Sequence, residues 1–144
     1  MIRFLGCLAV VLLEMAACAS ASAGNVPNVK PEGNQMFVSI EAEAANGMVL
    51  TNISNPGFAV VDVRSPEDFK AGHITNALNY EYNSPGFTIG ISSLDKNKTY
   101  LVYCKTGHRS ALAMDIMKKL GFSKVFCLFG GLDEWANRGC PVYR

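Results

Sequence analysis

The sequence predicts an α/β domain in which helices cover both faces of a parallel sheet. Residues 58–63, FAVVDV, are apolar nearly throughout, as expected of a strand that is buried on both sides. Residues 99–103 form a second strand-like run, and a helical segment follows it closely. Strands that alternate with helices at such spacings favour parallel pairing, with the helices packed on the two faces of the sheet.

The other elements follow from apolar patterns and turn residues. Strands are also predicted at residues 37–40, 77–80 and 124–128. Residues 41–53 are predicted to be a helix, and the residues on its packed side are Ala42, Ala45, Val49 and Ile53. Residues 83–93 are rich in Gly, Pro and Ser and are predicted to be a loop.

Two short helices are predicted from the residues at their starts. Ser65 and Pro66 are typical of the N-cap and the first position of a helix. Residues 132–137 follow the turn at Gly130 and Gly131 and form the last predicted helix, which carries Trp135 as a core residue.

The stretch at residues 100–120 places Cys104 between a predicted strand and a predicted helix. From Ser110 onward the residues Leu112, Ile116 and Leu120 recur every four positions, which predicts the packed side of that helix. The loop before it, CKTGHR, then lies at the start of a helix, where free N–H groups and the helix dipole favour an anion. We therefore expect Cys104 to be a thiolate, with its pKa lowered from about 8.5 toward roughly 7 or below.

Three other loop residues fit the same expectation. Gly107 lets the loop curl, since glycine adopts a positive φ without steric cost. Lys105 and Arg109 add positive charge beside the cysteine. Arg109 either holds an anionic substrate or braces the loop by donating to several carbonyl groups.

Composition limits the classes of function. The chain has 144 residues, of which 49% are hydrophobic and 17% charged, so it is long enough for one globular domain. Its formal net charge is +1, and this near-neutral balance argues against nucleic acid as a partner.

The amino terminus is typical of a secretion signal. Arg3 gives a positive start, residues 4–13 form an apolar run, and small residues follow. The apolar run is about half of the roughly 20 residues that a membrane span needs. We therefore expect residues 1–23 to be a signal peptide, residues 24–35 a linker and residues 36–144 the folded domain.

Two processing routes fit this signal. Cleavage after Ala21 or Ala23 would release an exported chain, and the bacterial periplasm is its expected location. Alternatively, residues 15–18, MAAC, are similar to a bacterial lipobox, and Cys18 would become a lipidated first residue. The chain would then be anchored to a membrane surface without spanning it.

Three stretches together resemble the single-domain rhodaneses, a family of sulfurtransferases. They are VVDVRSPEDFKAGHITNALNY at residues 60–80, YCKTGHRS at residues 103–110 and FGGLDEWANRGCPV at residues 129–142. The resemblance covers about residues 37–143 and implies a five-stranded parallel sheet flanked by helices. It also implies that the loop from Cys104 to Arg109 is the active loop, with Cys104 as the catalytic residue.

The activity implied by the resemblance is transfer of a sulfane sulfur. The Cys104 thiolate attacks the outer sulfur of a donor such as thiosulfate, sulfite leaves, and the persulfide then passes its sulfur to cyanide or a thiol. The residues expected to bind the donor are Lys105, Thr106, Gly107, His108 and Arg109. Those expected to support the loop are Asp62, Arg64 and Ser110, the first two as a buried or half-buried pair near the end of the strand.

The resemblance has one departure and leaves two rival functions open. In some two-domain rhodaneses a basic substrate-binding residue stands four positions after the arginine of the D-x-R motif, but Asp68 holds that place here. A phosphatase or arsenate reductase of the Cdc25 type needs five residues between its cysteine and arginine, whereas four separate Cys104 from Arg109. A non-catalytic rhodanese-like module that binds a partner or senses redox state is the other rival, and such modules commonly lack the cysteine.

No cofactor or metal is expected, since no second Cys/His pair accompanies Cys104 and His108. Cys127 lies in an apolar predicted strand and is expected to be a buried small hydrophobic residue. Cys140 precedes a proline. A role as a resolving thiol for Cys104 in an oxidising compartment is an alternative, but no pattern in the sequence brings the two within disulfide distance.

Overall fold

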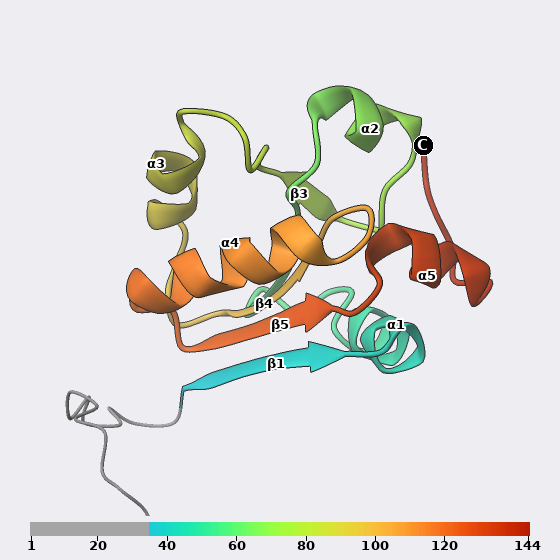
Figure 1. Cartoon of the computed structure of the whole chain (residues 1–144). Helices are drawn as coiled ribbons and strands as arrows, with labels where there is room; N and C mark the ends of the chain where they lie inside the picture. Colours follow the sequence, from blue (N-terminus) through green and yellow to red (C-terminus); the bar gives the residue numbers. More distant parts are fainter. Residues whose placement is uncertain (1–34) are drawn as a thin grey trace, which may run out of the picture. The chain divides into compact units, whose positions relative to one another are not determined.

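The computed structural model describes residues 35–144, which form a five-stranded sheet with helices on both faces (Figure 1). The strands pair in parallel in the order β1-β5-β4-β2-β3. The elements are β1 Met36–Ile40, α1 Ala42–Thr51, β2 Phe58–Asp62, α2 Pro66–Ala71, β3 Ala77–Asn79, α3 Phe87–Ser92, β4 Thr99–Tyr103, α4 His108–Lys119, β5 Lys124–Leu128 and α5 Gly131–Asn137. The predicted α/β fold is confirmed. The predicted signal peptide 1–23, with Cys18, and nearly all of the linker 24–35 lie outside the described residues.

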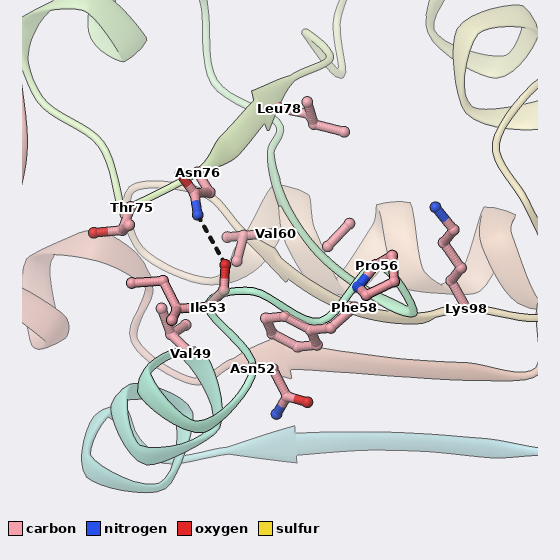
Figure 2. A pocket seen from close by; sticks show the side chains of 11 residues that line it. Val49, Asn52, Ile53, Pro56, Phe58, Val60, Thr75, Asn76, Leu78 and Lys98 are labelled. Carbon is pink, nitrogen blue, oxygen red and sulfur yellow. Dashed lines mark hydrogen bonds between the residues drawn. The ribbon is translucent and has the colours of Figure 1, made fainter.

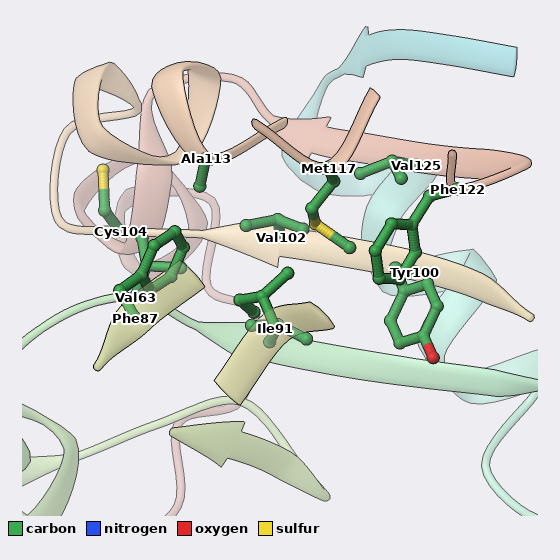
Figure 3. Packing of buried hydrophobic residues seen from close by; sticks show 11 residues of the cluster. Val63, Phe87, Ile91, Tyr100, Val102, Cys104, Ala113, Met117, Phe122 and Val125 are labelled. Carbon is green, nitrogen blue, oxygen red and sulfur yellow. The ribbon is translucent and has the colours of Figure 1, made fainter. Parts of the chain in front are cut away.

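Side chains that alternate along the strands build one core on each face of the sheet. On β4, Tyr100 and Val102 enter the core covered by α3 and α4. Leu101 and Tyr103 enter the core covered by α1 and α5. This is the period-two geometry of a strand. Figure 3 shows the first core, where Met117 of α4 packs over Val102.

Helix α1 packs through three of the four residues predicted for its inner side. Ala42, Ala45 and Val49 are buried. The prediction for Ile53 is wrong, because the helix ends at Thr51 and Ile53 is 51% exposed. Asn52 ends the helix, since its side-chain amide donates to the carbonyl of Met48 at 2.9 Å. A local side-chain bond of this kind competes with helix continuation and gives no signal in an apolar pattern.

Helix α2 begins as predicted. The Ser65 hydroxyl accepts a hydrogen bond from the N–H of Asp68 at 3.2 Å, and Pro66 is the first helical residue. The helix therefore has a capped start directly after the end of β2.

The predicted loop at residues 83–93 is wrong in part, because it contains helix α3. Phe87 and Ile91 lie one turn apart and are both buried in the core with α4. Gly90 approaches Tyr80 so closely that a Cβ at this glycine would lie 2.9 Å from the tyrosine ring. Tertiary burial stabilises this short helix, whereas its glycine and serine content favours a loop.

The side of helix α4 that faces the sheet matches the predicted one in part, because Ile116 and Leu120 are partly buried against the core as predicted. Its buried residues are Ser110, Ala113 and Met117. Leu112, predicted to pack inward, is 39% exposed. Small residues near the start of the helix allow it to approach the sheet closely beside the loop, so in this turn Leu112 does not mark the packed side.

Candidate active site

Cys104 follows the carboxyl end of β4, and the loop from Cys104 to Gly107 leads directly into α4. Ligands of open α/β sheets bind at this edge. The residue is only 1% exposed and packs at one end of the core, beside Val63 and Phe87 (Figure 3). The strand, loop and helix predicted around Cys104 are therefore present.

Hydrogen-bond donors surround the Cys104 sulfur. The N–H of Gly107 donates to Sγ at 3.1 Å, and the Ser110 hydroxyl lies 3.5 Å from it. Burial alone raises the pKa of the Cys104 thiol. Hydrogen bonds from the Ser110 hydroxyl and from the N–H groups of Ser110, Gly107 and Thr106 outweigh burial, so the pKa is lowered below that of a free cysteine. Gly107 presents its N–H from a φ of 94°, which glycine adopts without strain.

The charged side chains of the loop play a smaller part at the sulfur than predicted. Lys105, Thr106 and His108 are exposed, and Arg109 is half-buried. Within residues 35–144, none of these four side chains makes a hydrogen bond or an ion pair. Arg109 therefore does not brace the loop through carbonyl groups of the described chain. The lowered pKa of Cys104 is caused chiefly by hydrogen bonds rather than by the two cations.

The start of α5 holds the loop from outside, which the sequence does not predict. The N–H of Leu132 donates to the carbonyl of Cys104 at 2.8 Å, and the N–H of Asp133 donates to the carbonyl of Lys105 at 3.0 Å. The Lys105 carbonyl and the Thr106 N–H belong to one trans peptide group and point in opposite directions. Because α5 fixes the carbonyl outward, the Thr106 N–H is directed inward at the Cys104 sulfur.

Two glycines make this contact between α5 and the loop possible. A Cβ on Gly131, whose φ is 62°, would lie 2.5 Å from the carbonyl carbon and oxygen of Lys105. A Cβ on Gly107 would lie 3.2 Å from the backbone nitrogen of Gly130. From the sequence, Gly130 and Gly131 indicate only a turn. A glycine pair directly after a buried strand is nevertheless the signal that could have identified a close backbone approach.

Asp62 and Arg64 form the predicted buried ion pair. Arg64 Nη2 donates to Asp62 Oδ2 at 2.6 Å and to the carbonyl of Gly72 at 2.6 Å. Asp62 stands opposite Tyr103 in the pairing of β2 with β4. The pair thus fixes the end of β2 against the residue that precedes Cys104, and its side chains do not contact the sulfur.

The other two described cysteines lie on opposite faces of the sheet. Cys127 of β5 is buried, as predicted, and its Sγ lies 3.3 Å from the Ser110 hydroxyl oxygen. Burial raises the pKa of the Cys127 thiol, so it keeps its proton. Cys140 packs against the core beneath α1 and α5, whereas Cys104 belongs to the core beneath α3 and α4. All three are free thiols, and Cys140 is not placed to resolve Cys104.

Two hollows of similar size lie at opposite ends of the sheet. One, of about 300 Å³, opens near the amino ends of β2, β3 and β4 and contains no residue of the active loop (Figure 2). The other, also about 300 Å³, lies near the carboxyl ends, and Pro66, Tyr80, Glu81 and Phe87 are among its lining residues. Phe87 also packs beside Cys104. Neither hollow is lined by a residue of the active loop, but the second lies at the same edge of the sheet as Cys104.

Neither a metal site nor a membrane-spanning helix is found in the described part of the chain. No group of three or more His, Cys, Asp or Glu side chains in residues 35–144 is arranged to hold a metal ion. No helix among these residues is long and apolar enough to cross a membrane.

A cysteine with a lowered pKa among N–H donors, at the carboxyl edge of a parallel α/β sheet, is typical of proteins that use a cysteine sulfur in a backbone cradle. Residues 46–138, more than half of the chain, match the family model described as "Rhodanese-like domain". The chain belongs to this family, and the predicted resemblance to rhodaneses is confirmed.

Relatives of the chain carry sulfurtransferase names. This chain is 35% identical over 107 residues to "Probable adenylyltransferase/sulfurtransferase MoeZ" of Mycobacterium tuberculosis, a match that covers 69% of this chain but 27% of MoeZ. It is 34% identical over 102 residues to "Thiosulfate sulfurtransferase GlpE" of Stutzerimonas stutzeri, covering 70% of this chain and 86% of GlpE. Among solved structures, a rhodanese-related protein from Thermoplasma volcanium matches with a TM-score of 0.58 and 32% identity, over 73% of this chain and 96% of that one. The chain therefore belongs to a sulfurtransferase family and spans about a quarter of the length of MoeZ.

Proposed function

We propose that the protein is a sulfurtransferase that carries a sulfane sulfur on Cys104, from a donor such as thiosulfate to cyanide or a thiol. The set of donors at Sγ carries the proposal. The N–H of Gly107 at 3.1 Å and the hydroxyl of Ser110 at 3.5 Å stabilise negative charge at this sulfur. The name of the GlpE relative, a thiosulfate sulfurtransferase, supports thiosulfate as the first donor to test.

The reaction has two steps. The Cys104 thiolate attacks the outer sulfur of thiosulfate, the sulfur–sulfur bond breaks, and sulfite leaves with the electron pair. Cyanide or an acceptor thiolate then attacks the terminal sulfur of the persulfide and restores the Cys104 thiolate. The terminal sulfur of the persulfide is anionic, so N–H groups of the loop stabilise it as they stabilise the thiolate.

The lowered pKa of Cys104 favours this function over a module that only binds a partner, whereas a redox-sensing module would share this feature. A module that only binds a partner has no need of an acidified thiol inside a ring of donors. The second hollow is lined in part by Phe87, which also packs beside Cys104, so it is the region where approach of an acceptor is best tested.

Intact mass spectrometry tests the first step directly. The reduced protein, incubated with thiosulfate and then freed of it, is expected to gain the mass of one sulfur atom, and added cyanide is expected to remove it. Peptide mapping should place the sulfur within residues 99–105, the tryptic segment that contains Cys104. No mass gain with thiosulfate or with a thiol persulfide donor would overturn the proposed function.

Lys105 is expected to set the preference for charged donors. Lys105 is exposed and follows Cys104 directly in the chain. A charge-assisted hydrogen bond from its ammonium to dianionic thiosulfate would be strong enough to change the rate. Lys105→Ala should lower kcat/KM for thiosulfate by about tenfold, with a smaller loss for a neutral donor. Added salt should reduce the wild-type preference, because exposed charges are screened over about 10 Å at moderate ionic strength.

Lys96→Ala is the matched control for removal of the Lys105 charge, because Lys96 is also exposed but precedes β4, at the opposite end of that strand. Its kcat/KM should equal that of the wild type. Equal losses for charged and neutral donors in Lys105→Ala would mean that Lys105 acts on the Cys104 thiolate instead.

We further propose that the protein is exported. Arg3, the apolar residues 4–13 and the small residues that follow support this proposal. The amino-terminal mass of the protein from its native cell tests it, since a start near Gly24 indicates simple cleavage and a lipidated start at Cys18 indicates anchoring. A cytoplasmic chain that keeps Met1 would contradict both routes.

A further inference from the structure

A second buried thiol lies behind the Cys104 sulfur. Cys127 is 2% exposed, and its Sγ lies 3.3 Å from the Ser110 hydroxyl oxygen. That same oxygen lies 3.5 Å from Cys104 Sγ. One hydroxyl group therefore links the two sulfur atoms through two hydrogen bonds, and the reaction described above does not use Cys127.

The Ser110 hydroxyl has one proton and two acceptors within reach. It lies 3.0 Å from the carbonyl oxygen of Gly107 and 3.5 Å from Cys104 Sγ. A hydroxyl donates one full hydrogen bond at a time, so when Ser110 donates to the Gly107 carbonyl it does not donate to the Cys104 sulfur. The orientation of this hydroxyl therefore decides whether the Cys104 sulfur keeps a side-chain donor.

Cys127 supplies a donor to the Ser110 oxygen. Its thiol stays protonated, because burial raises its pKa, and it donates into the hydroxyl oxygen. This occupies one lone pair of the oxygen and polarises the hydroxyl, which then donates more strongly. A stronger donor gains most from the acceptor with the larger negative charge, which is the Cys104 thiolate.

We propose that Cys127 is a positioning residue that directs the Ser110 hydroxyl toward the Cys104 sulfur and so supports its anionic form. The inference rests on the proposed function for its use in sulfur transfer, but its effect on the Cys104 thiol can be measured without any transfer.

The sheet fixes Cys127 in this place. Cys127 pairs with Val102 on β4 and with Ser39 on β1, so it stands on an inner strand. Cys104 lies two residues beyond Val102, past the end of β4, so strand pairing does not hold the two cysteines opposite each other. Both thiols are free, so the link between them runs through Ser110.

The pH dependence of Cys104 alkylation tests the proposal. Wild type, Cys127→Val and Cys127→Ser are treated with iodoacetamide across a pH series, and the label is read on the tryptic segment 99–105. Cys127→Val keeps an apolar side chain of similar size but removes the donor. Its alkylation rate should fall about threefold at pH values below the Cys104 pKa, as expected for loss of one weak hydrogen bond, and should equal the wild-type rate at high pH. Cys127→Ser restores a donor and should return most of the rate.

The controls separate this role from packing and from the proposed function. Cys140→Val removes a thiol on the other face of the sheet and should leave the profile unchanged. Thermal unfolding identifies a variant that does not fold, and Cys127→Ala then replaces Cys127→Val.

An unchanged alkylation profile in Cys127→Val, or equal losses in the valine and serine variants, would overturn the proposal. So would transferred sulfur on segment 125–138, which contains Cys127. A shifted profile in a protein that transfers no sulfur would leave this inference standing and reject the proposed function.

Discussion

The Cys104→Ser variant is expected to lose sulfur transfer while it keeps its fold. A serine hydroxyl stays protonated in this site and forms no persulfide, so turnover of thiosulfate and cyanide should fall by a factor of about 10⁴ or more. The side chain is nearly the same size, so the buried position beside Val63 and Phe87 stays filled. Steady-state kinetics and thermal unfolding measure the two effects.

Cys140→Ser is the control for this variant, because Cys140 is also a free thiol but packs on the other face of the sheet. It should retain full turnover. Transfer that persists in Cys104→Ser would assign the reaction to another residue. A collapse of the melting temperature would instead assign a structural role to Cys104.

The Gly131→Ala variant is expected to lose activity about a hundredfold, because a displacement of about 1 Å at a reacting group has this effect. The new Cβ would lie 2.5 Å from the carbonyl of Lys105 and 2.6 Å from that of Cys104, so either the loop or α5 must move. Either movement breaks the bonds from Leu132 and Asp133 that direct the loop N–H groups at the sulfur. The pKa of Cys104 should therefore rise, and the pH–rate profile should shift toward higher pH.

Gly139→Ala is the matched control for backbone strain. Gly139 has a φ of 71°, close to the 62° of Gly131, but a Cβ there has no heavy atom within 4 Å. Both variants carry the cost of a left-handed alanine, about 1–2 kcal/mol. Only Gly131→Ala should lose activity, as measured by kcat/KM and by the alkylation rate of Cys104. Equal losses would show that strain, rather than contact with the loop, explains the effect.

Local patterns in the sequence predict the strands and the position of Cys104 well. The run at residues 58–63 is apolar because β2 is covered on both faces, and Cys104 is visible because a strand and a helix flank it. Some of the hydrogen-bond donors at the Cys104 sulfur can also be predicted, because Gly107 and the start of α4 lie within a few residues of Cys104 in the sequence. Short-range geometry of this kind is encoded within a few residues.

Features that depend on distant residues are not visible in those patterns. Helix α3 exists because Phe87 and Ile91 are buried under α4, although its composition favours a loop. The contact between Gly131 and Lys105 joins the first residue of α5 to the loop before α4, two segments that are far apart in the sequence, and it forms only when α5 packs against the loop. The bond from Cys127 to Ser110 likewise joins β5 to α4. Predicting such contacts needs the three-dimensional arrangement, because neither hydropathy nor turn chemistry records them.

The bonds from α5 to the loop also make the acidity of Cys104 depend on the docking of a separate helix. Residues 131–133 belong to a different element from the loop, so β4 and α4 can pack together while the carbonyls of Cys104 and Lys105 still lack these partners. Without α5, the peptide group between Lys105 and Thr106 is no longer held with its N–H toward the sulfur, although the donors from Gly107 and Ser110 remain. A truncated polypeptide that lacks α5 is therefore expected to have a less acidic Cys104.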